Sequence, residues 1–315
     1  SLGSLFLMLY FLVYFFMSQI VSISPLYFVV LIFLAGLMKF FYWVPYHVEF
    51  VHFIDKHHKA RQLSYLTILI AIIGIFVPLF SGWVIDKFGF GVLFLMCILV
   101  LGISLLTVRF IPSTREKYTF GYFETFAKLF SKKHFKTNLA YFSDGFQDHI
   151  GFVVWPIFIF LLLKGEYLSV GLLSAVIVLV STVLNFLVGE ASDKFDKKKI
   201  LRTGSMLYAL GWLFKSLVAT SLHVFLAGTF HNLSGILIRT PFDATTYEIA
   251  ADEGHYVDEF TVLREMSLHL GKVVSTVFSL LVLTTFSLNW LFILAAGLSL
   301  LMNLICREEF YLAKR

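Results

Sequence analysis

Asp144 and Asp148 stand one helical turn apart inside a long apolar segment, and His149 adjoins them. An ionisable side chain in such a segment is costly, so we expect it to face a cavity or a charged partner. A buried carboxylate that takes up and releases a proton is one interpretation of Asp148. The other is a fixed ion pair with Lys272 or Lys39 that holds helices together. The residue pattern leaves both open.

Other polar side chains interrupt other apolar segments. Lys39 lies near mid-segment, with Tyr42 and Trp43 on about the same helical face. His231 and Asn232 are also near mid-segment, and a hydrogen bond between helices is the preferred role of His231. Two further expectations concern the remaining charges: Arg264 and Glu265 form a structural pair, and Lys215 extends its ammonium outward to the membrane surface.

The composition decides what kind of element carries these residues. Of the 315 residues 59% are hydrophobic and 14% are charged, against about 25% charged in a soluble domain, and the mean hydropathy is +0.86. A soluble protein would have to expose this excess as large patches. Cys97 and Cys306 provide neither a disulfide framework nor a metal-ligand spacing. The sequence therefore predicts an all-α membrane protein, a polytopic helical bundle.

Ten apolar segments are long enough to be membrane helices, at about 5–22, 26–50, 63–83, 90–110, 139–163, 169–188, 200–220, 223–241, 260–285 and 288–306. Lys and Arg concentrate in the loops that follow the second, fourth and sixth segments and in the C-terminal tail, whereas the opposite loops hold only Lys87 and Lys164. Basic loops mark the cytoplasmic side. The loop after the eighth segment is the exception and is acidic, but acidic residues count little in this rule. This distribution explains the net charge of +5 without nucleic acid and predicts cytoplasmic ends for the C-terminal half.

The loop from Arg109 to Lys136 has a pattern of its own. Phenylalanines recur in it at helical spacing with lysines around them, at Phe120, Phe123, Phe126 and Phe130. This pattern predicts an amphipathic helix on the cytoplasmic leaflet. It divides the chain into four membrane segments (residues 1–110), a linker (111–136), six membrane segments (137–307) and a tail (308–315).

The segment from Gly189 to Leu201 carries a motif: Gly189, three residues, Asp193, Lys194, and a basic run that includes Lys198. It resembles the signature loop of the major facilitator superfamily, although Asp196 stands where a Gly is commoner. In that family the loop joins helices two and three, and a degenerate copy joins helices eight and nine. The resemblance implies that the ten segments are helices three to twelve of twelve, with the first two helices missing from this chain.

The resemblance also implies a site and a gate. Helices four, seven, ten and eleven line the central cavity of that family. The implied substrate cavity comprises Lys39, Tyr42, Trp43, Asp148, His231, Asn232 and Lys272, and Asp148 and Asp144 are the candidates for proton coupling. The implied cytoplasmic gate comprises Gly189, Asp193, Lys194 and Lys198, with Arg239 as the partner of Asp193.

The function that follows is secondary active transport of a small solute by alternating access, with proton coupling as a hypothesis. The expected protein is a monomer in the cell membrane, without cofactor, metal or nucleic acid. The alternative is a non-transporting receptor or assembly protein on a transporter-like fold. An enzymatic rival, a di-iron desaturase, would use His47, His52, His57 and His58, but such enzymes need several histidine clusters and the remaining histidines are scattered.

Overall fold

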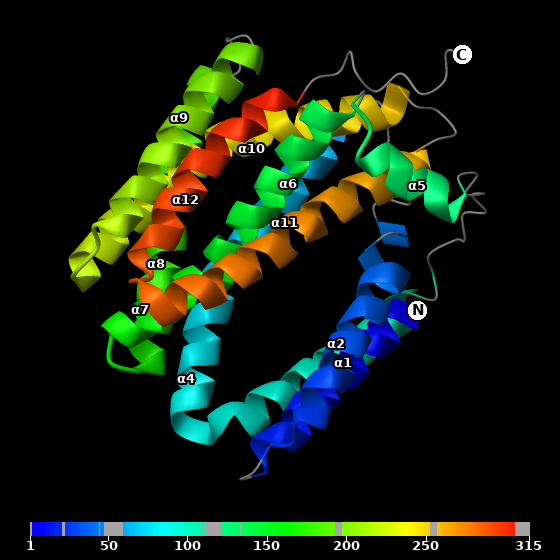
Figure 1. The fold of residues 1–315 in the computed structure, drawn as a ribbon. Coiled ribbons are helices and arrows are strands. Elements are labelled where there is room, and N and C mark those ends of the chain that lie inside the picture. Colours follow the sequence, from blue (N-terminus) through cyan, green and yellow to red (C-terminus); the bar gives the residue numbers. More distant parts are fainter. Residues whose placement is uncertain are drawn as a thin grey trace.

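The computed structural model describes residues 2–20, 23–43, 45–46, 59–108, 110, 121–132, 134–192, 197–252 and 257–305. All regular secondary structure in these ranges is helical. In their described parts, the ten predicted apolar segments are largely helical, and the number of membrane crossings stays a prediction. Figure 1 shows the helical rods crossing the molecule in broadly similar directions.

The N-terminal part contains α1 (Leu2–Ser18), α2 (Pro25–Met38), its π-helical continuation η1 (Lys39–Trp43), and α4 (Lys59–Val108). Helix α2 begins where the Ser24 side chain accepts a hydrogen bond from Leu26 N at 3.4 Å, with Pro25 in the first turn. Helix α4 is two rods joined at Gly89, whose φ of 80° belongs to the left-handed region that glycine tolerates. The expected turn between the third and fourth segments is therefore a sharp bend.

The two rods of α4 have different neighbours. Gly82, in the first rod, approaches Gly171 of α8 so closely that a Cβ on it would lie 3.4 Å from the Gly171 Cα, a small-residue crossing that is common in membrane helices. In the second rod, the Phe94 ring stacks on Tyr14 of α1 with centroids 5.3 Å apart. Figure 1 accordingly shows α1 and α2 beside one rod of α4, while the other rod reaches the remaining helices.

The C-terminal part begins with α6 (Phe135–His149), the π-helical η2 (Ile150–Val154) and α7 (Trp155–Leu162), which form one long rod. Pro156 explains the irregular turn, because proline has no N–H to donate to the preceding turn. The rods that follow are α8 (Tyr167–Ser192), α9 (Lys197–Ser216), α10 (Ser221–Asp252), α11 (Val257–Thr285), α12 (Asn289–Ser299) and η4 (Leu300–Leu304). Helix α10 continues through Pro241, beyond the predicted end of that segment.

The helices pack in pairs: α9 against α10, α6 against α11, α4 against α8, and α12 against α9. Glycines make the α6–α11 crossing close. A Cβ on Gly145 would overlap the carbonyl of Leu268, and one on Gly271 would overlap the carbonyl of Phe142. These contacts fix the relative positions of α6 and α11, which carry most of the charges inside the bundle.

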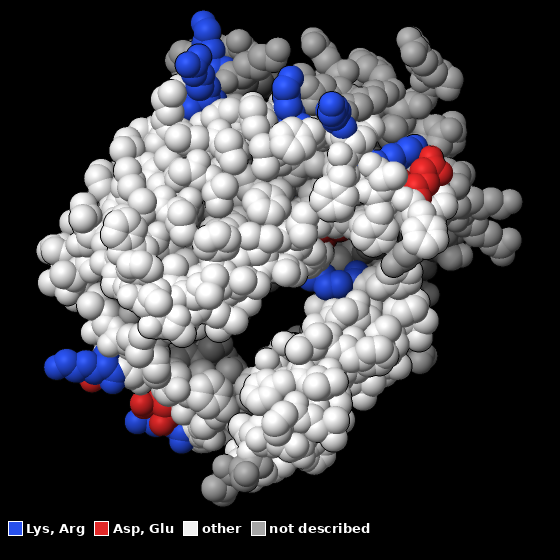
Figure 2. Space-filling view, in the orientation of Figure 1, with Lys and Arg blue, Asp and Glu red and all other residues white. Residues whose placement is uncertain are grey.

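The outer surface is apolar over much of its area. Six helical stretches of the described chain are long and apolar enough to cross a membrane, and the stretch Ile68–Thr107 has a mean hydropathy of 2.7 with 0% of its most apolar window buried. Figure 2 shows a broad white belt, with Lys, Arg, Asp and Glu concentrated toward its edges. A bilayer accommodates such a surface, since every helix satisfies its own backbone hydrogen bonds.

Helix α5 (Tyr122–Leu129) falls in the loop where the phenylalanine spacing predicts a helix. Phe123 is 83% exposed, and the Lys128 ammonium lies 3.0 Å from the Glu124 carboxylate. That ammonium, together with the Gly121 N–H, lowers the pKa of Glu124 below its usual value. The location of α5 on a membrane surface, and the division of the chain around it, stay predictions.

Candidate functional site

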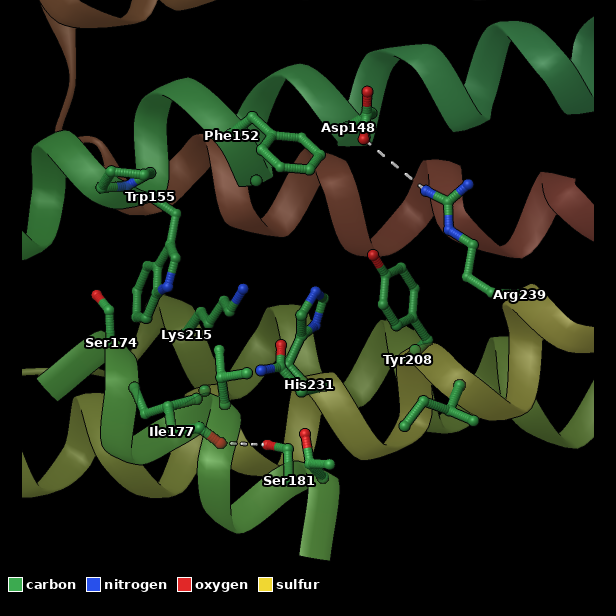
Figure 3. Close-up of a pocket in the computed structure, with 18 of the residues that line it drawn as sticks. Asp148, Phe152, Trp155, Ser174, Ile177, Ser181, Tyr208, Lys215, His231 and Arg239 are labelled. Carbon is green, nitrogen blue, oxygen red and sulfur yellow. Dashed lines mark hydrogen bonds and ion pairs between the residues drawn. The ribbon is translucent and has the colours of Figure 1, made fainter. Parts of the chain in front are cut away.

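A cavity of about 900 Å³ lies between the first rod of α4 and the helices of the C-terminal part. Side chains from α4, α6, η2, α7, α8, α9 and α10 line it. The apolar ones include Ile68, Phe152, Ile159, Ile177 and Val178, and the polar ones include Asp148, Ser181, Tyr208, Lys215, His231, Asn232 and Arg239. Figure 3 shows Asp148 and Arg239 toward one end of this space and Trp155 and Lys215 toward the other.

At the first end, Asp148 and Arg239 line the cavity, and with Asp144 and Lys272 they form a group that we call the ion-pair cluster. Arg239 of α10 lies 2.7 Å from an oxygen of Asp144 and 3.9 Å from one of Asp148, both on α6. Lys272 of α11 lies 2.6 Å from the other Asp148 oxygen. Two carboxylates thus face two cations, and the cluster joins three helices.

The observed partner of Arg239 differs from the predicted one. Its guanidinium contacts Asp144 and Asp148, because α10 continues past Pro241 and Arg239 lies within the bundle instead of at a helix end. Asp193 and Lys194 lie outside the described residues, and Gly189 and Lys198 are placed only as positions in α8 and α9. The proposed gate formed by these residues therefore stays a prediction.

The second end contains a group that we call the Lys215 corner: Lys215, Trp155, Trp212 and His231. The side chain of Lys215 is 3% exposed. Its ammonium lies 4.3 Å from the centroid of the Trp212 ring and 4.6 Å from that of Trp155, within the range of a cation–π interaction. The His231 ring lies against Trp212 and stacks on Tyr208 with centroids 4.2 Å apart.

The prediction that Lys215 extends to the membrane surface is wrong, for a geometric reason. Side chains of an α-helix lean toward its N-terminus, and Lys215 stands one residue before the C-terminal end of α9. The lean therefore directs its ammonium back along the helix, between two tryptophans. The signal in the sequence was a lysine three residues after Trp212, which places both on one helical face.

The preferred role of His231 is also wrong. Neither of its ring nitrogens has a hydrogen-bond partner among the described residues, and Nδ1 is fully buried. The ring fits because residue 211 is a glycine: a Cβ there would lie 2.9 Å from Nδ1. By contrast, the predicted pair of Arg264 and Glu265 is confirmed, with 2.8 Å between nitrogen and oxygen.

The structure brings together some of the other predicted residues. Asp148, His231 and Asn232 line the cavity, and Lys272 binds Asp148. Lys39, Tyr42 and Trp43, which were predicted in the same site, are not among the residues that line this cavity. The Lys39 ammonium lies 4.6 Å from the centroid of the Trp43 ring, and its charge interacts with those of Asp148, Glu265 and Lys272. The two ends of the cavity are linked by Gln147, which accepts a hydrogen bond from Trp212 Nε1 at 3.2 Å and donates one to Asp144 at 3.3 Å.

Among the described residues, no group of three or more His, Cys, Asp or Glu side chains is placed to hold a metal ion. The histidines of the desaturase alternative, His47, His52, His57 and His58, lie outside the described residues.

Comparison with known proteins decides the family. The model of the major facilitator superfamily matches residues 137–308, more than half of the chain. The chain belongs to the major facilitator superfamily. Its fold is thus an all-α polytopic membrane fold, and the resemblance seen at Gly189–Leu201 is confirmed at the level of the family, whose members are transporters.

A curated relative gives no further information on the substrate. The uncharacterized protein YqgE of Bacillus subtilis (strain 168) is 26% identical to this major facilitator chain over 256 residues, which cover 77% of the chain and 58% of the relative. The chain therefore spans less than two thirds of the length of that relative.

Proposed function

We propose that the full protein is a secondary active carrier that moves a small solute across the cell membrane by alternating access, with the ends of its C-terminal half in the cytoplasm. The observation that carries this proposal is the cavity of about 900 Å³ between α4 and the C-terminal helices. Its position between two groups of helices suits a solute site that opens to either side as the groups rock.

Proton coupling through Asp148 is part of this proposal. The contact with Lys272 is the ion pair that the other interpretation of Asp148 predicts, and coupling requires that this pair break and re-form. This carboxylate holds Lys272 of α11 and, at longer range, Arg239 of α10. Protonation of Asp148 would remove both attractions, so α11 and α10 would lose one contact with α6. A proton arriving from one side of the membrane would thereby favour a different arrangement of these helices. Asp144, which Arg239 binds more closely, has the second role of keeping Arg239 in place.

The test is transport by the full-length protein in proteoliposomes. With an imposed pH gradient, Asp148→Asn should abolish accumulation of a transported solute and leave exchange of that solute partly intact, because the neutral amide cannot carry a proton. Glu166→Gln, which changes an exposed carboxylate away from the cavity, is the matched control and should accumulate solute like the wild type. Unchanged accumulation by Asp148→Asn would reject proton coupling through this residue.

The same assay separates the carrier from the alternative of a non-transporting receptor or assembly protein. A protein that binds a solute in the cavity and shows no flux for any solute of the panel would support that alternative and would contradict the carrier.

A further inference from the structure

We propose that the Lys215 corner is the binding site for the anionic group of an amphipathic organic anion, and that such anions are the substrate class of this carrier. Only the second statement, that such anions are the substrate class, rests on the proposed transport function. Binding at the Lys215 corner does not depend on flux.

The first step is the missing counter-charge. Lys215 is almost fully buried, yet no carboxylate of the described chain lies within ion-pair distance of its ammonium, and no hydrogen-bond acceptor is found for it. Burying a charge is costly unless it is paired, and two indole faces compensate only part of that cost. An ammonium with this environment has a favourable interaction left to make with an anion.

The second step is that the nearby carboxylates are already engaged. Asp144 and Asp148 of the ion-pair cluster are held by Arg239 and Lys272 at 2.7 and 2.6 Å. The cluster is balanced, so the positive charge of Lys215 is not offset by it. Asp148 is the only carboxylate among the described residues that line the cavity, and it is already paired, so a cationic solute would find no free carboxylate in the lining and would be repelled by Lys215.

The third step is the second free donor. His231 lines the same cavity, its ring contacts the same Trp212 ring that Lys215 contacts, and its nitrogens have no hydrogen-bond partner among the described residues. Figure 3 shows the Lys215 and His231 side chains reaching into the same region, beside Trp155. His231 Nδ1 is buried against Gly211, so a carboxylate beside Lys215 would accept from the ammonium with one oxygen and from the imidazole only through an Nε2–H tautomer.

The fourth step concerns the rest of the solute. The wall between the Lys215 corner and the ion-pair cluster is mostly apolar, with Phe152, Ile159, Ile177 and Val178 among its residues. The cavity volume of about 900 Å³ is at the upper end of the range of small-molecule sites, about 300–1,000 Å³. The solute class is therefore an apolar body with one anionic head, rather than a sugar, which needs many hydrogen-bond partners.

The experiment uses three compounds with one apolar body and three head groups: 4-phenylbutyrate (anionic), 4-phenylbutanamide (neutral) and 4-phenylbutylamine (cationic). Butyrate and octanoate test other bodies with the same head. Binding to the full-length protein in nanodiscs is measured by isothermal titration for the wild type, Lys215→Met, Lys215→Arg and the exposed-lysine control Lys87→Met, whose native side chain is 61% exposed.

The expected result is that at least one carboxylate binds more tightly than its amide and amine analogues. Lys215→Met should weaken that binding about 10- to 100-fold, the usual effect of losing a hydrogen bond to a charged group. The amide should bind Lys215→Met as it binds the wild type. Lys215→Arg should retain most of the binding, and Lys87→Met all of it.

Three outcomes would overturn the inference: no carboxylate binds, the amine binds as tightly as the acid, or Lys215→Met keeps the preference for the acid. Unfolding of Lys215→Met is excluded by its melting curve, and Lys215→Arg provides the charge-conserving check.

Flux in proteoliposomes separates this inference from the proposed function. Lys215-dependent binding of an acid without flux of any solute supports the site and contradicts the carrier. Flux of a neutral or cationic solute that is unaffected by Lys215→Met supports the carrier and contradicts the site.

Discussion

The two ends of the cavity treat buried charge in opposite ways. In the ion-pair cluster, two carboxylates and two cations from α6, α10 and α11 satisfy one another. In the Lys215 corner, a cation and an imidazole have aromatic neighbours and no described acceptor. The satisfied end suits a contact between helices that breaks and re-forms, and the unsatisfied end suits a ligand. Removing a cation should therefore have opposite effects on stability at the two ends.

The largest effect is expected from Arg239→Met. This change leaves Asp144, whose side chain is 4% exposed, as a buried carboxylate without its principal cation. Breaking a buried pair in this way typically costs about 3–5 kcal/mol, so the melting temperature in detergent should fall steeply. The double variant Asp144→Asn with Arg239→Met should recover most of the loss, since no unpaired charge remains. Equal losses for the single and double variants would show that Arg239 acts through packing alone.

A smaller loss is expected from Gly145→Ala, which acts on the helix crossing beneath the ion-pair cluster. The added Cβ would overlap the carbonyl of Leu268 and push α11 away from α6, and overpacking of this kind costs about 1–3 kcal/mol. The matched control is Gly297→Ala in α12, where a Cβ would meet nothing within 4 Å. The control should melt within error of the wild type.

In addition, Gly145→Ala should impair pH-driven accumulation more than binding of 4-phenylbutyrate, because α11 provides Lys272 to the cluster and nothing to the Lys215 corner. The reverse order would break the distinction between the two ends.

The two ends also differ in how far the sequence could predict them. Long apolar segments and their polar interruptions are sufficient to locate the rods and to single out Asp144, Asp148 and Lys272, because an ionisable residue in lipid needs a partner. The identity of each partner depends on helix rotation and crossing, which the sequence does not specify. Arg239 was expected in the gate beside Asp193, and its contacts with Asp144 and Asp148 at the cavity were not foreseen.

Lys215 was misjudged for a related reason. A lysine near a helix end reaches the membrane surface only if its side chain can point that way, and the direction of α9 makes it point inward. Its surroundings then depend on two tryptophans from different helices, Trp155 on α7 and Trp212 on α9. Of the two contacts, only the one with Trp212 is local in sequence. Aromatic neighbours that come together only in the folded bundle leave no pattern in the chain.

The smallest effect, and the one of opposite sign, is expected from Lys215→Met in the absence of any added anion. Methionine has nearly the same length and packs well against aromatic rings, so the change removes an unpaired buried charge without leaving a void. The loss of the cation–π contacts costs about 0.5–2 kcal/mol, and the removal of the desolvated charge gains somewhat more. The expected net result is a stabilisation of about 1 kcal/mol, visible as a higher melting temperature in detergent, with Lys87→Met unchanged.

Adding a carboxylate that binds should make the wild type melt at the higher temperature, because the ligand stabilises the wild type by mass action and has no ammonium to bind in the variant. A fall in melting temperature for Lys215→Met without ligand would mean that Lys215 is compensated within the fold as Arg239 is, and that the two ends of the cavity do not differ.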